Sequence, residues 1–224
     1  FLDTPGHAAF NNMRKRGGNL ADIAILVVDA HQGMQEQTLE SINILRQYKT
    51  PFILALNKVD LVDGWRSGSS GLLQTLKSQH ERTQQQLDNI LYTAVAKLSE
   101  LGFQAERFDR ISDYTNQVAI VPVSAKTGEG LPELLMVLIG LAQKYLEKSL
   151  QVEVSGPGKG TILEVKEEGG LGTVLDVVLY DGSLKINDTI VLGTLEQPLV
   201  TKVRALFEQE KGRGSKLKSV KEVH

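Results

Sequence analysis

Residues 51–60 read Pro-Phe-Ile-Leu-Ala-Leu-Asn-Lys-Val-Asp, and this stretch decides the fold. Its apolar part is unbroken, which is typical of a strand buried on both faces of a parallel sheet covered by helices. Residues 23–28 and 118–123 have the same apolar form, and they are followed by Asp29 and Ser124. Three predicted strands therefore deliver polar residues at their carboxyl ends.

Helical patterns lie between and after these strands. Residues 38–48 place apolar side chains on one face, and a longer apolar stripe runs over residues 87–101. A third stripe covers residues 134–142, with Pro132 in the predicted first turn. Strands that alternate with helices predict a doubly wound α/β domain, in which ligands bind outside the carboxyl ends of the strands.

The pattern changes after about residue 150. Short β-rich runs over residues 161–166, 172–180, 189–193 and 200–206 are separated by the turn signals Asp181-Gly182 and Asn187-Asp188. We therefore expect an α/β domain over residues 1–149, followed by a small all-β barrel domain over residues 150–224.

The composition excludes several classes of protein. The chain has 25 Lys+Arg against 27 Asp+Glu, a formal net charge of −2, and 41% hydrophobic residues. These values exclude a disordered chain, a collagen and a polybasic nucleic-acid-binding tail. The chain contains no cysteine, which excludes a disulfide scaffold, a thiolate metal site and a cysteine nucleophile, and which fits a reducing compartment. The longest apolar run, residues 134–142, is too short to span a membrane.

The first candidate site is the polar end of the stretch quoted above. A fixed carboxylate at Asp60 can accept two hydrogen bonds from the paired N–H groups of guanine, whereas adenine lacks this donor pair. The stem of Lys58 can lie over the plane of the base, and Asn57 can tie neighbouring loops together. For four residues taken alone, a strand that ends in a polar turn is an equally good interpretation.

The second candidate is the short loop Ser124, Ala125 and Lys126, which follows the third strand. Its backbone N–H groups can meet the carbonyl oxygen of guanine. The loop continues into Thr127-Gly-Glu-Gly130, so a plain connection from strand to helix is the simpler interpretation when the loop is taken alone.

The third candidate is Asp3-Thr-Pro-Gly-His7. A carboxylate such as Asp3 at a strand end can hold Mg²⁺, often through water. Gly6 lets a backbone N–H approach a phosphate closely, and His7 is placed to orient an attacking water. A strand followed by a Pro-Gly turn explains the same residues equally well.

Taken together and in this order, the three motifs resemble the third, fourth and fifth sequence motifs of the GTPase superfamily. The segment over residues 29–40 is similar to one that translational GTPases carry, and His7 matches the histidine that this class places after its DxxG motif. The connection between Asp60 and Ser124 is long and includes a helical insert over about residues 64–112. Its sequence Gly64-Trp-Arg66 is similar to the translation initiation factor 5B family of archaea and eukaryotes, the counterpart of bacterial initiation factor two.

The resemblance implies a P-loop GTPase-type parallel sheet and a cytoplasmic translation initiation factor that binds GTP or GDP with Mg²⁺. In this family Asp3 would act on Mg²⁺ through water, Gly6 would sense the γ-phosphate, and His7 would position the hydrolytic water. The factor would promote joining of the ribosomal subunits and placement of initiator tRNA, and hydrolysis of GTP to GDP and phosphate would trigger its release. The implied partners are both ribosomal subunits, including ribosomal RNA, and initiator tRNA, with the factor itself a monomer.

One departure from the family pattern matters. The sequence contains no G-x-x-x-x-G-K-[ST] motif and no switch I threonine, and it begins with Phe1 instead of Met. We therefore expect a fragment that lacks the N-terminal strands of the sheet and that, by itself, neither holds GTP tightly nor hydrolyses it. The alternatives are a bacterial-type initiation factor two, an elongation-type translational GTPase, and a non-catalytic module that binds ribosome or tRNA.

Overall fold

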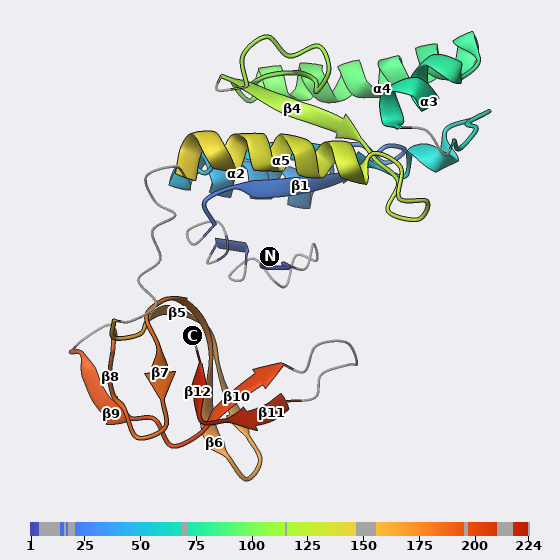
Figure 1. Ribbon diagram of the computed structural model, residues 1–224. Coiled ribbons are helices and arrows are strands. Elements are labelled where there is room, and N and C mark those ends of the chain that lie inside the picture. Colours follow the sequence, from blue (N-terminus) through green and yellow to red (C-terminus); the bar gives the residue numbers. More distant parts are fainter. Residues whose placement is uncertain are drawn as a thin grey trace. The chain divides into compact units, whose positions relative to one another are not determined.

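The computed structural model describes residues 1–4, 14–15, 17, 21–68, 71–114, 116–146, 156–194, 197–209 and 217–223. The chain divides into two compact units, Phe1–Lys148 and Ser149–His224. Figure 1 labels their helices and strands where there is room, and each unit is described by itself below.

The first unit is built on a four-stranded parallel sheet. Its strands are β1 (Ala24–Asp29), β2 (Phe52–Asn57), β3 (Gln104–Arg107) and β4 (Gln117–Pro122), in the order β1-β2-β4-β3. The register pairs Asp29 with Asn57, and Leu56 with Pro122. The carboxyl ends of β1, β2 and β4 therefore lie level with one another at one edge of the sheet.

The predicted α/β class and parallel sheet are confirmed, and each of the three predicted strands begins and ends within one residue of its predicted limits. Strand β3 was not predicted, because its sequence Gln-Ala-Glu-Arg is polar. Among the described residues β3 pairs only with β4, and an edge strand of this kind does not need the apolar run of a central strand.

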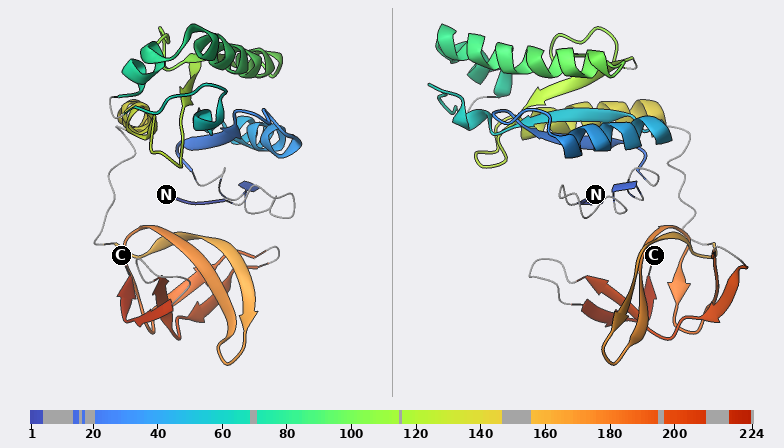
Figure 2. Two further views of the ribbon diagram at one scale, coloured as in Figure 1. Left: turned by 90° about the vertical axis from the view of Figure 1, so that its right-hand side faces the viewer. Right: turned by 180° about the vertical axis from the view of Figure 1, so that it is seen from behind.

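Helices cover both faces of this sheet. They are α2 (Glu36–Tyr48), α3 (Leu72–Ser78), α4 (Glu81–Glu100) and α5 (Leu131–Leu146), together with the short 3₁₀ turn η2 (Val59–Leu61). The connections from β1 to β2 and from β2 to β3 cross the sheet in the same direction, so right-handed crossovers place α2 and α4 on one face. The left view of Figure 2 shows α5 on the opposite face.

The core lies where β2 and β4 are covered on both faces. Ile53 and Leu54 of β2 and Ile120 and Val121 of β4 are fully buried. Helix α4 packs its predicted apolar stripe inward, and its buried residues are Thr83, Leu87, Leu91, Ala94 and Leu98. These contacts attach the insert firmly to the rest of the first unit.

The predicted apolar stripe of α5 is partly wrong. Leu134, Val137 and Leu141 are the buried residues, whereas Leu135 and Ile139 are 47% and 56% exposed. The helix meets the sheet along one line of residues at i, i+3 and i+7, so the neighbouring leucine and isoleucine point elsewhere.

The second unit is all-β, as predicted. Its strands are β5 (Lys159–Glu168), β6 (Gly172–Asp181), β7 (Leu184–Lys185), β8 (Thr189–Leu192), β9 (Leu199–Lys202), β10 (Leu206–Gln209), β11 (Leu217–Val220) and β12 (Glu222–Val223). They form the antiparallel pairs β5-β6, β8-β9, β10-β11 and β7-β12. The predicted turn residues Gly182 and Asn187 both have positive φ, at 66° and 74°. In the part of the chain that the structure describes, no helix of either unit combines the length and apolarity needed to cross a membrane.

Candidate functional site

Asn57 joins the ends of the two central strands. Its side-chain Oδ1 accepts hydrogen bonds from the backbone N–H of Lys58 at 2.8 Å and of Ala125 at 3.0 Å. The backbone adds two further links, from the Val123 N–H to the Leu56 carbonyl (2.8 Å) and from the Val59 N–H to the Val123 carbonyl (3.2 Å). The loops that follow β2 and β4 are therefore held as one piece.

Asp60 and Ser124 form a second link between the same loops. The buried Ser124 hydroxyl donates to Oδ1 of Asp60 at 2.6 Å and accepts the backbone N–H of Thr127 at 3.2 Å. Within the described residues, Oδ2 of Asp60 takes part in no hydrogen bond. A fixed carboxylate with accepting capacity therefore lies beside the loop after β4.

Lys58 has an unusual backbone and a defined partner. Its φ of 69° and ψ of 33° are left-handed, a conformation that costs a non-glycine residue about 1 kcal/mol or more. Its ammonium lies 2.6 Å from Oδ2 of Asp29, and this contact ties the end of β1 to the end of β2. The structure thus gives the Lys58 ammonium a protein partner that the sequence-based prediction did not include.

Asp29 is the site residue that sequence reasoning missed. Besides Lys58, it accepts hydrogen bonds from the backbone N–H groups of His31 (2.8 Å) and Gln32 (3.2 Å) through Oδ1. The Lys58 side chain lowers the pKa of Asp29 most, and the two backbone donors lower it further. In the sequence, its position directly after an apolar strand could have indicated a site residue. In the structure, it pairs with Asn57 in the neighbouring strand.

The loop after β4 leaves one backbone donor available. Ala125 and Lys126 are exposed, and the Ala125 N–H is taken by Asn57. The Lys126 N–H has no acceptor among the residues that the structure describes. A hydrogen-bond acceptor on a ligand can therefore be met here, two residues after the Ser124 that bonds Asp60.

The third predicted motif is not brought to this edge by any described contact. Asp3 is exposed, and none of the described hydrogen bonds or ion pairs joins it to Asn57, Asp60 or Ser124. Gly6 and His7 lie outside the described residues. The described residues contain no group of three or more His, Cys, Asp or Glu side chains that could hold a metal ion.

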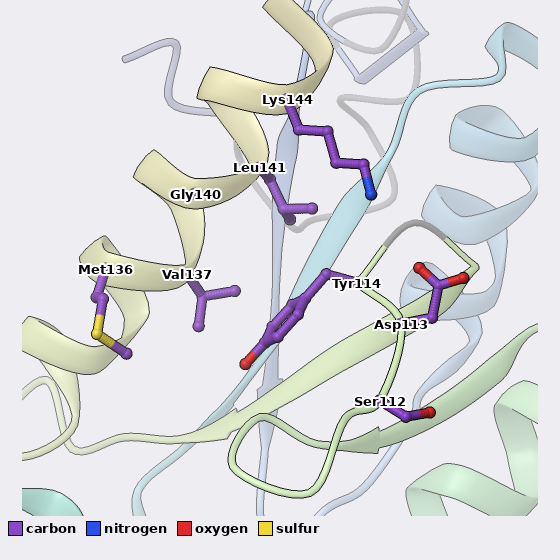
Figure 3. A pocket seen from close by; sticks show the side chains of 8 residues that line it. All are labelled: Ser112, Asp113, Tyr114, Met136, Val137, Gly140, Leu141 and Lys144. Atoms are coloured by element: carbon purple, nitrogen blue, oxygen red, sulfur yellow. The ribbon is translucent and has the colours of Figure 1, made fainter.

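A pocket of about 470 Å³ lies apart from these residues, between α5 and the loop before β4. Figure 3 shows the ring of Tyr114 pointing from that loop toward Val137 and Leu141 of α5. The pocket contains none of the predicted site residues, so the convergent polar groups at the ends of β1, β2 and β4 remain the candidate site.

The donor and acceptor pattern of the candidate site fits guanine. The carboxylate of Asp60 matches a ligand edge with two neighbouring N–H groups, and the Lys126 N–H matches a carbonyl oxygen beside them. Adenine presents an amino group where guanine has this carbonyl oxygen, and it would leave a carboxylate and an N–H unpaired.

Comparisons with known proteins agree with this geometry. The family described as the elongation factor Tu GTP binding domain matches residues 1–144. A protein of Methanocella arvoryzae named probable translation initiation factor IF-2 is 53% identical over 214 residues, which cover 95% of this chain and 36% of that protein. A relative of the same name from Archaeoglobus fulgidus is 50% identical over 228 residues, covering 100% of this chain and 38% of the relative.

Solved structures give the same result. The GDP-bound aIF5B of Aeropyrum pernix has a TM-score of 0.87 and 46% identity, covering 100% of this chain and 38% of that one. The elongation factor SelB of Methanococcus maripaludis shares only the fold, with a TM-score of 0.58 and 24% identity over 99% of this chain and 39% of that one. The chain spans a little over a third of the length of the curated relatives named above.

Proposed function

The chain belongs to the elongation factor Tu GTP binding domain family of translational GTPases, and from this premise we propose that it carries the guanine-recognising part of a 5B-type translation initiation factor. Residues 1–149 form part of the GTP-binding domain, with the insert over about residues 64–112, and residues 150–224 form the translation-factor β-barrel domain. The match over residues 1–144 and the division into two units support this assignment.

The observation that carries the proposal is the joining of the loops after β2 and β4 through Asn57 and through Ser124 and Asp60. Asp60 accepts the paired N–H groups of guanine, and the N–H of Lys126 meets its carbonyl oxygen. Ser124 holds Asp60 in position. The stem of Lys58 lies along the base. Asn57 fixes Ala125 and with it the backbone of the recognition loop, the name used below for residues 124–130 after β4.

The phosphate side of the nucleotide belongs to Asp3, Gly6 and His7. Asp3 would hold Mg²⁺, through water, and the bound ion would supply positive charge that neutralises the phosphates. Gly6 contacts the γ-phosphate and His7 orients the attacking water, since phosphoryl transfer depends mainly on positioning and electrostatics. The sequence Asp3-Thr-Pro-Gly-His7 and its place within the family match support these roles.

The names of the relatives support a role in translation initiation, and we propose the following cellular role on that basis. The factor binds GTP in the cytoplasm, promotes joining of the ribosomal subunits around initiator tRNA, contacts ribosomal RNA as a monomer, and is released after GTP hydrolysis. Identity of 53% to a protein named as an initiation factor, against 24% to the elongation factor SelB, favours initiation over elongation.

The test uses a hybrid in which this chain replaces the aligned segment of the Archaeoglobus fulgidus relative. The 224 residues contain no G-x-x-x-x-G-K-[ST] motif, so we expect the chain by itself to bind GDP far more weakly than the hybrid does. The substitution Asp60→Asn replaces an acceptor with an amide donor. It should weaken GDP binding about 100-fold or more and admit xanthosine diphosphate, whose base offers a carbonyl where guanine has an amino group.

Competition of GDP and xanthosine diphosphate against a fluorescent nucleotide measures this change. Asp63→Asn is the matched control, because Asp63 lies three positions further on with a side chain that is 75% exposed. Unchanged discrimination between the two bases in the Asp60→Asn hybrid would remove Asp60 as the base reader and would favour a non-catalytic binding module.

A further inference from the structure

One carboxylate in the loop after β4 receives four hydrogen bonds. Oε2 of Glu129 accepts from the indole N–H of Trp65 (3.2 Å) and from the hydroxyls of Ser67 (2.9 Å) and Thr127 (2.9 Å). Oε1 accepts from the backbone N–H of Gly68 at 3.0 Å. Three of these donors belong to the start of the insert, far from Glu129 along the chain.

The start of the insert is itself held in place. The buried side chain of Gln79 accepts the Arg66 N–H at 2.8 Å and donates to the Arg66 carbonyl at 2.7 Å. Trp65 packs against the hydrophobic core, and its backbone N–H donates to the Val62 carbonyl. The donors that meet Glu129 therefore come from an anchored segment.

The backbone of Glu129 is hydrogen-bonded to Ser124, at the start of the recognition loop. The Glu129 carbonyl accepts the backbone N–H of Ser124 at 2.9 Å. Thr127 links the same two residues, since its backbone N–H donates to the Ser124 hydroxyl and its own hydroxyl donates to Oε2 of Glu129. A neighbouring link reinforces this connection, since the Leu72 N–H donates to Oε1 of Glu133 at 2.7 Å. A shift of Glu129 would move Ser124, the residue that holds Asp60.

The chemistry of the four donors requires a carboxylate. Hydroxyl groups can turn to accept a hydrogen bond, but the indole N–H of Trp65 and the backbone N–H of Gly68 can only donate. These two fixed donors meet different oxygens of Glu129. A glutamine at this position would aim its amide N–H₂ at one of them in either orientation. The set of four hydrogen bonds to the Glu129 side chain, called the clasp below, would then lose at least one bond.

We propose that Glu129 is a positioning residue through which the insert holds the guanine-recognition loop, so that the contact between Glu129 and the segment over residues 65–68 sets how fast guanine nucleotides dissociate. The inference rests on the proposed function and extends it, because it assigns the insert a part in nucleotide release. Glu129 itself does not need to touch the nucleotide.

The test measures dissociation of fluorescent GDP from the hybrid defined above. Glu129→Gln should speed dissociation about tenfold, the cost of one lost hydrogen bond to a charged group. Preference for GDP over xanthosine diphosphate should be retained, since Asp60 is intact. Trp65→Phe keeps the aromatic packing, removes one donor and should speed dissociation in the same direction by a smaller factor. Glu100→Gln is the control, because Glu100 is an exposed residue at the end of α4.

The possible outcomes distinguish a failure of the Glu129 inference from a failure of the proposed function. Faster dissociation in both clasp variants with an unchanged base preference supports the inference. Dissociation within twofold of the unsubstituted hybrid, even with a lowered melting temperature, overturns it and leaves Glu129 a purely structural residue. An unsubstituted hybrid that fails to retain GDP overturns the proposed function, and the inference with it.

Discussion

The ammonium of Lys58 lies 2.6 Å from Oδ2 of Asp29, so an ion pair joins the ends of the two neighbouring strands β1 and β2. The other oxygen of Asp29 accepts the backbone N–H groups of His31 and Gln32. One carboxylate therefore orders the loop after β1 and also fixes the direction of the Lys58 side chain. The stem of Lys58 is thereby placed along the edge where the base is proposed to bind.

Replacing Asp29 with asparagine removes this charge. We expect Asp29→Asn to lower the free energy of unfolding by about 1 kcal/mol or less, because the Lys58 ammonium is half exposed and water screens the pair. Urea unfolding of the 224-residue chain at pH 7 measures the loss. Asp22→Asn, at an exposed position, is the control and should change stability by less.

The pH dependence of the same variant has a defined sign. The pKa of Asp29 is lowered in the folded chain from the ordinary value of 3.8. Its contribution is therefore complete above that ordinary value and is lost as the pH falls through the lower folded value. The stability difference between the chain and Asp29→Asn should be constant from pH 7 to about pH 5 and should shrink below pH 4. A difference that grows on acidification would contradict the ion pair.

Trp65 provides a direct optical signal for the clasp, because it is the single tryptophan of the chain. Partial burial opposes ionisation of Glu129, but the donors Gly68, Ser67, Thr127 and Trp65 outweigh it and lower the pKa below the ordinary 4.5. The stability that Glu129 contributes is thus fully present above pH 4.5 and is lost as the pH falls through the lower pKa of the folded chain. Trp65 emission should change as the pH falls below 4.5 while the far-ultraviolet signal is still native. The same transition in Glu129→Gln would assign the emission change to another group.

Gly130 is the last residue of the recognition loop, and its position leaves no room for a side chain. Its φ is 76°, and a Cβ at this position would lie 2.1 Å from the Pro122 carbonyl oxygen. Gly130→Ala must therefore shift the loop or the end of β4 and should cost about 3 kcal/mol of stability. Gly128→Ala is a matched control, since Gly128 has a φ of 84° but no atom within 4 Å of the added Cβ. It should cost only the backbone strain, about 1 kcal/mol.

Equal losses in the two glycine variants, measured by urea unfolding, would show that the close approach to Pro122 does not matter. A larger loss in Gly130→Ala would instead show that the close approach of Gly130 to the Pro122 carbonyl requires a residue without a side chain. The comparison separates steric contact from backbone conformation, because both glycines have positive φ.

The sequence predicts the parts of the fold in which burial determines residue type. Strands β2 and β4 are covered on both faces, and this requirement makes them unbroken apolar runs. Strand β3 is polar and could not be recognised in this way, and the exposed side of α5 carries Leu135 and Ile139 despite being solvent-facing. Local patterns indicate elements well, but they do not show which apolar residues meet the sheet.

Some residues of the candidate site could also be predicted from the sequence, and others could not. Residues at strand ends could be identified because topology alone brings such ends together. The ion pair of Asp29 and three of the four donors of Glu129 depend on contacts between distant parts of the chain, such as Trp65 with Glu129. No local pattern marks Glu129, since three of its four donors are supplied by the insert.

Substitution of His7 tests whether the protein is an enzyme or a binding module. In the hybrid, His7→Ala should lower ribosome-stimulated GTP hydrolysis about 100-fold, the contribution typical of a group that positions or activates the attacking water. GDP affinity should change little, because the base contacts through Asp60 and Lys126 are intact. His80→Ala is the matched control, since His80 is an exposed histidine that precedes α4.

The assay is phosphate release with and without ribosomes. Hydrolysis that persists in His7→Ala would assign water positioning to another group, whereas absence of stimulated hydrolysis from the unsubstituted hybrid would favour a ribosome-binding role without catalysis.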